Sequence, residues 1–296
     1  MIIPHKSGFV NIIGVPNVGK STLCNVLVGE RLSIITSKAQ TTRHRIFGIL
    51  NHENYQIVFS DTPGILKPSY KLHEKMMHSV SEAFQDADVF LFITDIFDDS
   101  VPDESYILKL QHTQSPVIII LNKIDLTNDQ KIEEKKKIWN DLLPNAVLLP
   151  ISALKQTGTE KILPLLLEFL PEGPAYYEKD QLTDKTERFF VSEIIREKIL
   201  LNYKKEIPYA CEVAVMAFKE EENIIRIDAN ILVERETQKG IIIGHKGEAL
   251  KKTGTAARLE AEKFFGKKIH LQLFVKVDKD WRNDETKLNQ IGRAHV

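Results

Sequence analysis

The sequence predicts a protein of two unlike parts: an α/β domain whose mostly parallel sheet carries helices on both faces, and a smaller α+β domain. Apolar runs of strand length alternate with helical stretches as far as residue 170. A proline- and glycine-containing break follows at residues 171–174, and beyond it the order of elements changes. We place the first domain at residues 1–172, a linker at 173–186, the second domain at 187–290 and a tail at 291–296.

The elements of the first part follow from hydrophobic patterning. We expect strands at 9–13, 45–50, 55–60, 88–94, 117–121 and 147–151, and helices at 21–28, 71–86, 105–111, 129–142 and 159–170. In the second of these helices Leu72, Met76, Val80 and Ala83 form one apolar face, which we expect to pack on the sheet. Because strands joined by helices run parallel, the loops at their carboxyl ends meet in one crevice.

The first of these loops matches the pattern G-x-x-x-x-G-K-[ST]. It consists of Gly14, Val15, Pro16, Asn17, Val18, Gly19, Lys20 and Ser21, and Thr22 continues into the helix. Backbone N–H groups of such a loop surround a phosphate, and the helix points its positive dipole end at the same charge. Lys20 can reach the terminal phosphates, and the Ser21 hydroxyl can ligate Mg²⁺. The alternative, a glycine turn that only precedes a helix, is disfavoured by the strand and helix on either side.

The loop after the strand at 117–121 reads Asn122, Lys123, Ile124 and Asp125. A carboxylate at Asp125 can accept hydrogen bonds from the adjacent N1–H and 2-amino groups of guanine, whereas adenine offers no such pair of donors. We expect Asn122 to tie neighbouring loops together and the Lys123 stem to cover the ring. A solvated turn is the alternative for the tetrapeptide alone. Ser152 and Ala153, after the last strand, are expected beside the guanine carbonyl.

A turn of Asp61, Thr62, Pro63, Gly64 and Ile65 follows the strand at 55–60. An acid here suits outer-sphere Mg²⁺ binding, and the Gly64 amide can meet a γ-phosphate. A threonine upstream of this turn closes the Mg²⁺ shell when the third phosphate is present, and we assign Thr42 rather than Thr41. Lys20, Thr42 and Gly64 are thus candidate catalytic residues. A common D-x-P-G turn and a polar loop are the alternatives.

These four motifs, in this order and after these strands, resemble the translation-factor-like GTPase superfamily. One position departs from its best-known pattern, because Ile65 stands where many small GTPases carry a glutamine that orients the attacking water. In similar GTPases an asparagine at the place of Asn17 helps to hold K⁺ near the phosphates. The resemblance therefore implies K⁺ as an activator and Asn17 as a catalytic residue. The alternative is that Asn17 only tolerates a turn conformation.

Composition and charge limit the partners. The net charge of −1 excludes a uniformly basic nucleic-acid binder, yet residues 1–184 hold 18 Lys and Arg against 23 Asp and Glu, whereas residues 185–296 hold 22 against 18. The mildly basic second part suggests a polyanionic partner. Two cysteines, Cys24 and Cys211, give no disulfide framework and suit a reducing compartment. We recognise no secretory signal and no apolar run of membrane-spanning length, so we expect a soluble protein.

The second part has the predicted order helix, strand, strand, helix, helix, strand, at residues 189–202, 209–218, 224–233, 237–243, 248–265 and 269–277. A G-x-x-G turn of Gly244, His245, Lys246 and Gly247 joins its two central helices. Backbone amides in such a turn can approach a phosphodiester chain, and Lys246 and Lys251 add charge. We expect Ile242 to line a groove for single-stranded bases. The order and the turn resemble a type II KH domain; a glycine turn that only caps a helix is the alternative.

Both parts together resemble the Era family of bacterial GTPases, in the TrmE-Era-EngA-like group. Beyond the motifs above, residues 40–45, 180–184 and 193–198 stand as that family writes them, and the resemblance spans nearly the whole chain. It implies a cytoplasmic, monomeric GTPase that needs Mg²⁺ and binds the 3′ end of small-subunit ribosomal RNA. It also implies a role in maturing the 30S subunit and a loose peripheral association with the inner membrane.

We therefore interpret the chain as an enzyme that hydrolyses GTP to GDP and phosphate and uses slow hydrolysis as a timer for RNA binding. Three alternatives stay open. A nucleotide-gated RNA-binding assembly factor would bind GTP while hydrolysis is incidental. An ATP-using metabolic enzyme is disfavoured by Asn122 and Asp125, and a membrane-signalling GTPase by the lack of a visible lipid-anchor motif.

Overall fold

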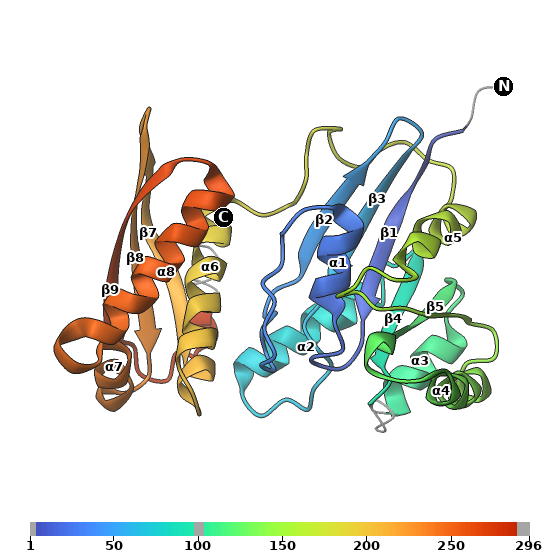
Figure 1. The fold of residues 1–296 in the computed structure, drawn as a ribbon, viewed down its shortest axis with the longest axis horizontal. Coiled ribbons are helices and arrows are strands. Elements are labelled where there is room, and N and C mark those ends of the chain that lie inside the picture. Colours follow the sequence, from blue (N-terminus) through green and yellow to red (C-terminus); the bar gives the residue numbers. More distant parts are fainter. Residues whose placement is uncertain (1–3, 98–103, 289–296) are drawn as a thin grey trace. The chain divides into compact units, whose positions relative to one another are not determined.

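The computed structural model describes residues 4–97 and 104–288, so the predicted tail at 291–296 lies outside the described residues. The chain divides into two compact units, one formed by residues 1–67 and 75–184 and the other by residues 68–74 and 185–296. Each unit has a sheet of its own (Figure 1). The predicted fold class, an α/β part followed by an α+β part, is confirmed.

The sheet of the first unit has six strands in the order β2-β3-β1-β4-β5-β6. They are β1 (Lys6–Ile13), β2 (Ile46–Asn51), β3 (Tyr55–Asp61), β4 (Val89–Asp95), β5 (Val117–Asn122) and β6 (Val147–Pro150). Neighbouring strands are parallel except β2 and β3, which form an antiparallel pair. The carboxyl ends of the parallel strands therefore meet at one edge, where the predicted motifs begin.

Helices cover both faces of this sheet (Figure 1). They are α1 (Lys20–Val28), α2 (Lys71–Ala83), α3 (Glu104–His112), α4 (Asp129–Leu142) and α5 (Ile162–Phe169), with 3₁₀ turns at Ile124–Leu126 and Thr159–Lys161. Ile107 of α3 and Trp139 of α4 share a core cluster with Phe92 of β4. Every residue of β4 from Phe90 to Ile93 is at most 1% exposed, as expected for a strand covered on both sides.

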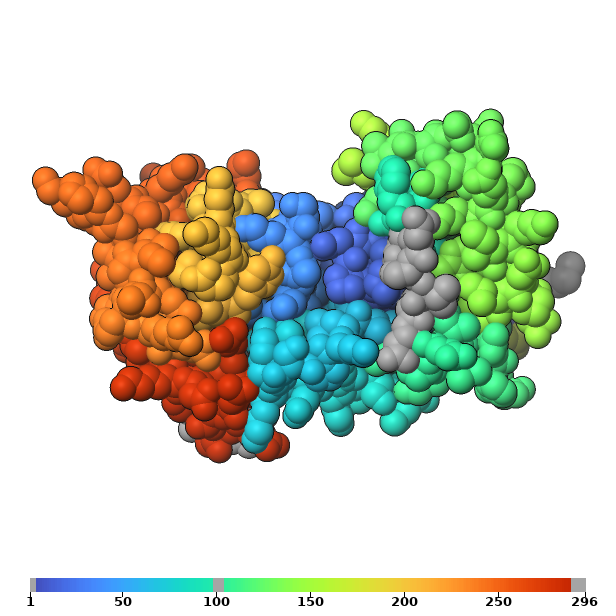
Figure 2. Space-filling view, turned by 90° about the horizontal axis from the view of Figure 1, so that it is seen from below, coloured from blue at the N-terminus to red at the C-terminus, as the bar shows by residue number. Residues whose placement is uncertain are grey.

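Helix α2 is amphipathic, as its sequence spacing predicts. Its apolar face is buried, with Met76, Val80 and Ala83 fully inaccessible, whereas Glu74 and His78 are exposed. The outer side of the helix belongs to the surface drawn in cyan in Figure 2. The helix ends at Ala83 rather than at residue 86, because the N–H of Phe84 donates to the carbonyls of both Val80 and Ser81 and so tightens the last turn. Within the described ranges, no helix is long and apolar enough to cross a bilayer.

The segment that we predicted as a linker lies along the outer edge of β2, and we call residues 176–184 the strap. The N–H of Ile49 donates to the carbonyl of Leu182 at 2.8 Å, and the N–H of Phe47 donates to Asp184 Oδ1 at 2.9 Å. Gly48 and Thr183 form an antiparallel bridge. The strap therefore occupies the hydrogen-bonding edge that β2 would otherwise present to solvent.

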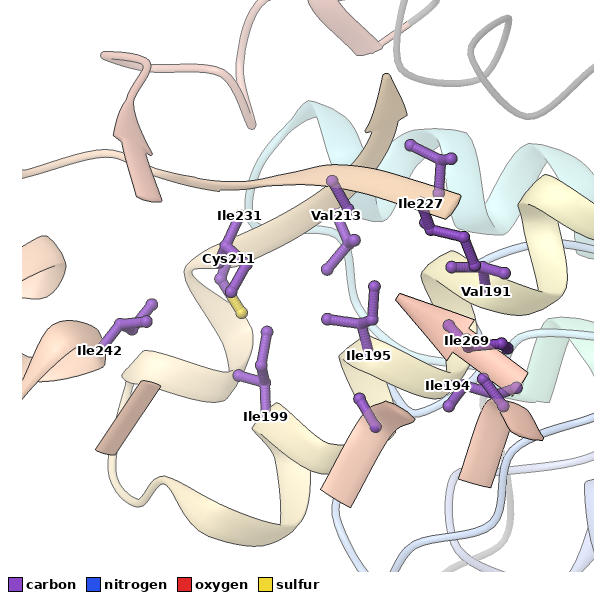
Figure 3. Packing of buried hydrophobic residues seen from close by; sticks show 14 of the residues in the cluster. Val191, Ile194, Ile195, Ile199, Cys211, Val213, Ile227, Ile231, Ile242 and Ile269 are labelled. Atoms are coloured by element: carbon purple, nitrogen blue, oxygen red, sulfur yellow. The ribbon is translucent and has the colours of Figure 1, made fainter. Parts of the chain in front are cut away.

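The second unit has a three-stranded sheet in the order β7-β8-β9, with β7 antiparallel and β9 parallel to β8. Its elements are α6 (Glu187–Asn202), β7 (Cys211–Glu220), β8 (Ile224–Val233), α7 (Glu236–Ile243), α8 (Glu248–Phe265) and β9 (Lys268–Val277). This is the predicted order of helices and strands. Side chains of α6 and all three strands converge in one apolar core, and Ile242 of α7 reaches it from the side (Figure 3).

Candidate functional site

The predicted motifs of the first unit surround one pocket of about 510 Å³ at the carboxyl ends of the strands. Its walls come from the phosphate loop, from residues 34–42, from Gly64 and from the loops after β5 and β6. The predicted residues that line it are Pro16, Asn17, Gly19, Lys20, Ser21, Thr22, Thr42, Gly64, Asn122, Lys123, Asp125 and Ala153. The other predicted residues belong to the same loops but do not line the pocket: Gly14, Val15, Val18, Asp61, Thr62, Pro63, Ile65, Ile124 and Ser152.

Two glycines of the phosphate loop are required by the space around them. A Cβ on Gly14, at φ 150°, would lie 2.2 Å from the carbonyl oxygen of Ile93. A Cβ on Gly19, at φ 103°, would lie 2.2 Å from Nδ2 of Asn122. Both backbone conformations favour glycine as well. The glycine spacing of the motif thus records how closely this loop approaches β4 and the loop after β5.

Lys20 is buried under the phosphate loop. Its Nζ donates to the carbonyl of Val15 at 2.7 Å and to that of Gly14 at 3.1 Å. Burial lowers the pKa of Lys20 to about 8, although the negative charge of Asp61 opposes the shift. The ammonium is therefore held across the loop at the place where a bound phosphate would supply the missing negative charge.

Three oxygen-bearing side chains from separate segments meet beside Lys20. The Ser21 Oγ lies 2.7 Å from Asp61 Oδ2 and 2.9 Å from Thr42 Oγ1. Thr41 is engaged elsewhere, since its Oγ1 lies 2.7 Å from Thr36 Oγ1 and donates to the carbonyl of Lys38 at 2.6 Å. The structure thus brings Thr42, rather than its neighbour, to the predicted metal ligands.

The Asp61 carboxylate has the burial and the open oxygen expected of an acid that helps to bind a metal ion. It is fully buried, and its Oδ1 makes no hydrogen bond to any described residue. Burial raises the pKa of Asp61, while the Ser21 and Ser33 hydroxyls and the charge of Lys20 act in the opposite direction. A buried carboxylate oxygen without a partner, beside two hydroxyls, is a donor set that Mg²⁺ and its water ligands prefer. The residues present fit this cation.

The turn after Asp61 is fixed against the phosphate loop. Thr62 Oγ1 donates to the carbonyl of Ile12 at 2.7 Å, and the N–H of Ile65 donates to the carbonyl of Gly14 at 3.1 Å. A Cβ on Gly64 would lie 2.7 Å from Pro16 Cγ, so only glycine permits this approach. Ile65 itself is 7% exposed.

Asn122 connects three loops around the base end of the pocket. Its Nδ2 donates to the carbonyl of Val18 at 2.7 Å, and its Oδ1 accepts from the N–H of Ala153 at 2.9 Å. Lys123 Nζ donates to the carbonyl of Asn17 at 2.8 Å. The Asp125 side chain is exposed toward the pocket. Asn122 therefore joins the loop after β5 to the phosphate loop and to Ala153, and Lys123 adds a second bond to the phosphate loop.

Several pocket residues were missed by the sequence analysis. Ile34, Ile35, Leu126 and Leu154 also line the pocket, and these apolar residues in loops carry no recognisable sequence pattern. Asp95 also escaped notice, although it ion-pairs with Lys123 at 2.6 Å. Its signal was present, because it is an acid at the carboxyl end of an apolar strand, the same context that singled out Asp61.

In the second unit the G-x-x-G turn forms a tight link between α7 and α8. Gly244, at φ 71°, could not carry a Cβ, which would lie 2.6 Å from the Cβ of Ala249. His245 and Lys246 are exposed, and Gly247 begins a groove of about 330 Å³. The groove lies along α8 and β9 and is lined by Gly247, Leu250, Lys251, Gly254, Thr255, Arg258, Leu271 and Leu273. Predicted Lys251 thus lies in the groove.

The prediction that Ile242 lines this groove is wrong. Ile242 has no exposed surface and belongs to the core cluster of the second unit (Figure 3). Its neighbour Ile241 is 50% exposed, because successive helical residues face different directions. The apolar side of the groove is formed instead by Leu250 of α8 and by Leu271 and Leu273 of β9.

Two family models match this chain. The 50S ribosome-binding GTPase model covers residues 9–123, and the KH domain model covers residues 206–282. Between them they span the phosphate loop, the Asp61 turn and Asn122 in the first unit, and the G-x-x-G turn in the second.

Similar proteins cover nearly the whole length. GTPase Era of Syntrophus aciditrophicus is 49% identical over 293 residues, which cover 98% of this chain and 96% of that protein. GTPase Era of Clostridium perfringens is 43% identical over 289 residues, 97% of this chain and 98% of that protein.

Two solved structures have the same fold throughout. One is Era in complex with MgGDPNP and nucleotides 1506–1542 of 16S ribosomal RNA, with a TM-score of 0.93, 36% identity and coverage of 99% of this chain and 100% of that one. The other is an Aquifex aeolicus Era variant bound to GDP and AlF4⁻, with a TM-score of 0.93, 36% identity and coverage of 98% and 100%.

Proposed function

Because the chain belongs to the Era family of GTPases and is therefore a GTP hydrolase, we propose that it is a GTP-dependent switch that assists assembly of the small ribosomal subunit. In this proposal the second unit binds the 3′ end of 16S ribosomal RNA through the G-x-x-G turn and its groove. The first unit reports whether GTP or GDP is bound. Support for the RNA comes from the related Era that was solved with a 16S ribosomal RNA fragment and a GTP analogue.

The observation that carries the nucleotide part is the meeting of Ser21, Thr42 and Asp61 beside Lys20. Thr42 lies in the loop between α1 and β2, which has no regular structure of its own. Contacts with a bound γ-phosphate can order such a loop, and loss of that phosphate on hydrolysis releases the loop. We assign Thr42 and the Asp61–Ile65 turn to this switch.

We include Mg²⁺ in the proposal because a related Era structure contains MgGDPNP. In this chain Ser21 and Thr42 would hold the ion directly, and Asp61 would hold it through its water ligands. Bound there, Mg²⁺ neutralises charge on the phosphate oxygens. Lys20 would supply a second positive charge to the phosphates, and the Gly64 amide would donate to the γ-phosphate.

Water activation differs from that of the small GTPases with a glutamine after the glycine. Ile65 has no polar side-chain atom, so another group has to compensate for the missing glutamine. We assign this role to K⁺ held in part by Asn17, which is exposed at the pocket with φ 65° and shares the lining with Thr36 and Ser37. Asn17→Ala should abolish the gain in hydrolysis that KCl gives over NaCl. Equal rates of the unchanged protein in the two salts would refute the role of K⁺.

Calorimetric titration tests the nucleotide site itself. GDP and GTP should bind far more tightly than ADP and ATP, and Asp125→Ala should remove the preference, because the base then loses its carboxylate partner. Equal affinity of the unchanged protein for ATP and GTP would refute a guanine site.

The proposed switch has its own test. The affinity for the RNA fragment is measured once with GDP bound and once with a non-hydrolysable GTP analogue bound, and the two values are compared. Equal affinity would remove the switch and leave the GTPase.

The alternative in which hydrolysis is incidental keeps both binding activities. It predicts that a variant able to bind GTP but not to cleave it supports subunit assembly as well as the unchanged chain does, whereas Lys20→Ala, which weakens binding, does not. Cytoplasmic location, monomeric state and loose membrane contact are implied by the family resemblance alone and stay predictions.

A further inference from the structure

Asp95 does not line the nucleotide pocket, but it contacts the pocket residue Lys123 and belongs to none of the recognised motifs. It is the last residue of β4 and lies in register with Asn122, the last residue of β5. Its side chain is only 10% exposed. Each carboxylate oxygen is engaged, since Oδ1 accepts from the N–H of Phe97 at 2.8 Å and Oδ2 accepts from Lys123 Nζ at 2.6 Å. The bond to Phe97 thus fixes the orientation of the carboxylate, and its other oxygen pairs with the lysine.

Lys123 carries this connection to the phosphate loop. The same Nζ that pairs with Asp95 donates to the carbonyl of Asn17 at 2.8 Å. Both Lys123 and Asn17 have left-handed backbones, at φ 66° and 65°, a conformation that is uncommon for lysine and more readily adopted by asparagine. One ammonium therefore links two such corners, one at the base end of the pocket and one in the phosphate loop.

We propose that Asp95 is a positioning residue for nucleotide binding, which anchors the Lys123 ammonium so that its stem covers the guanine and its head group holds the Asn17 corner. The inference rests on the proposed guanine site. Its physical basis is that a charge-assisted hydrogen bond is about twice as strong as a neutral one. Without the carboxylate, the Lys123 side chain, which is already 31% exposed, turns toward water and leaves both corners.

The position of Asp95 determines which kinetic constant responds. Its two carboxylate oxygens are engaged with Phe97 and Lys123, so it acts on the nucleotide through the lysine and not on the phosphates. Its loss should speed nucleotide release and raise KM, while kcat at saturating GTP, measured in NaCl so that the proposed K⁺ site at Asn17 does not contribute, changes less than twofold. A generally disordered pocket would lower kcat as well.

The test is the dissociation of a fluorescent GDP analogue after addition of excess GDP, for the full chain. Asp95→Asn keeps the shape and an acceptor for Phe97 but removes the charge, and release should become at least tenfold faster. Glu133→Gln serves as the matched control, because it removes the carboxylate of an ion pair of similar length, 2.7 Å to Lys136, on the outer side of α4. Release from the control should match that from the unchanged chain. Unaltered release from Asp95→Asn overturns the proposal.

A double-mutant cycle tests whether Asp95 acts through Lys123. Lys123→Met keeps an apolar stem and removes the ammonium, and adding Asp95→Asn to it should change release less than twofold. A double variant whose effect equals the product of the two single effects overturns the proposal. If thermal unfolding shows that Asp95→Asn does not fold, the cycle is run with Asp95→Glu, which moves the charge by one methylene, and the same outcomes decide.

The proposed guanine site and the role of Asp95 fail in different ways. If the unchanged chain does not prefer GDP to ADP, the guanine site itself is wrong, whatever Asp95→Asn does. If the preference is present and the Asp95 and Lys123 substitutions act independently, only the role of Asp95 is wrong.

Discussion

At the scale of single residues, the phosphate loop depends on positions where one added carbon atom has no room. Gly19→Ala would push against Nδ2 of Asn122, 2.2 Å from the new Cβ, and so displace the side chain that joins Val18 to Ala153. A shift of about 1 Å in a group that positions a substrate can lower the reaction rate about 100-fold. We expect a loss of GDP affinity of that size, measured by calorimetry.

A second glycine provides the control for this steric argument. Gly240 lies inside α7, and nothing stands within 4 Å of the place where its Cβ would be. Gly240→Ala should leave GDP affinity unchanged and stabilise the fold by about 0.5–1 kcal/mol, because glycine is the poorer helix former. Equal losses of GDP affinity in both variants would contradict the explanation from space.

Two adjacent isoleucines of α7 separate a core role from a surface role. Ile242 is completely buried, whereas Ile241 is 50% exposed. Ile242→Ala should lower the free energy of unfolding of the second unit by about 2–5 kcal/mol, because it opens a cavity in the core. Ile241→Ala should change it by less than about 0.5 kcal/mol. Chemical denaturation measures both. If Ile242→Ala lowered RNA affinity while stability stayed unchanged, Ile242 would belong to the groove after all.

At the scale of elements, the loop between α1 and β2 divides its two adjacent threonines between different tasks. Thr42→Ala removes the hydroxyl that meets Ser21, so GTP hydrolysis at limiting Mg²⁺ should fall by about 10- to 100-fold. GDP affinity should change little, since the third phosphate is absent. Thr41→Ala is the matched comparison, because its hydroxyl bonds to Thr36 and Lys38 within the loop. A larger effect of Thr41→Ala on the Mg²⁺ dependence would reverse the assignment.

The turn between α7 and α8 allows a separate electrostatic test. Lys246 and Lys251 are exposed at the turn and the groove. Replacing both by alanine should weaken RNA binding and reduce the slope of log affinity against log salt concentration by about 1.4, since each lost contact to single-stranded RNA removes about 0.7. Lys137→Ala, an exposed lysine of α4, should change neither quantity. A normal salt slope in the double variant would place the RNA elsewhere.

Much of the fold and of the nucleotide site could be predicted from the sequence, because the patterns that indicate them lie within short segments. Periodicity predicted the strands and helices, and the phosphate loop, the Asp61 turn and the Asn122 loop follow strands whose carboxyl ends meet. Periodicity also identified the buried face of α2. In each case the sequence pattern states a physical requirement of the fold, such as an apolar face or a turn too tight for a side chain.

What could not be predicted depends on contacts between distant residues. The inward direction of Ile242 is set by how α7 rests against the sheet, and a single helical turn does not reveal it. The pairing of Asp95 with Lys123 requires the register of β4 and β5. The strap looks like a polar linker by composition, because its hydrogen bonds to β2 use mainly backbone groups, which every sequence has.

At the scale of the whole molecule, charge is divided along the chain. The first 184 residues are acidic on balance and the remainder basic, although the total is −1. A polyanion is therefore attracted to the second part and repelled by the first, except at the phosphate pocket. This division suits a protein that keeps its nucleotide and its RNA on different units.

The strap has a consequence for anyone who wishes to prepare the first unit by itself. A fragment cut at residue 172 would carry the complete pocket, yet the N–H groups of Phe47 and Ile49 would lose their acceptors in the strap. Strand edges with unpaired N–H and C=O groups pair with other chains. Light scattering should therefore show that this fragment self-associates, whereas one cut at residue 184 should remain monodisperse. The twelve residues 173–184, by which the two fragments differ, would then decide whether the preparation stays monodisperse or aggregates.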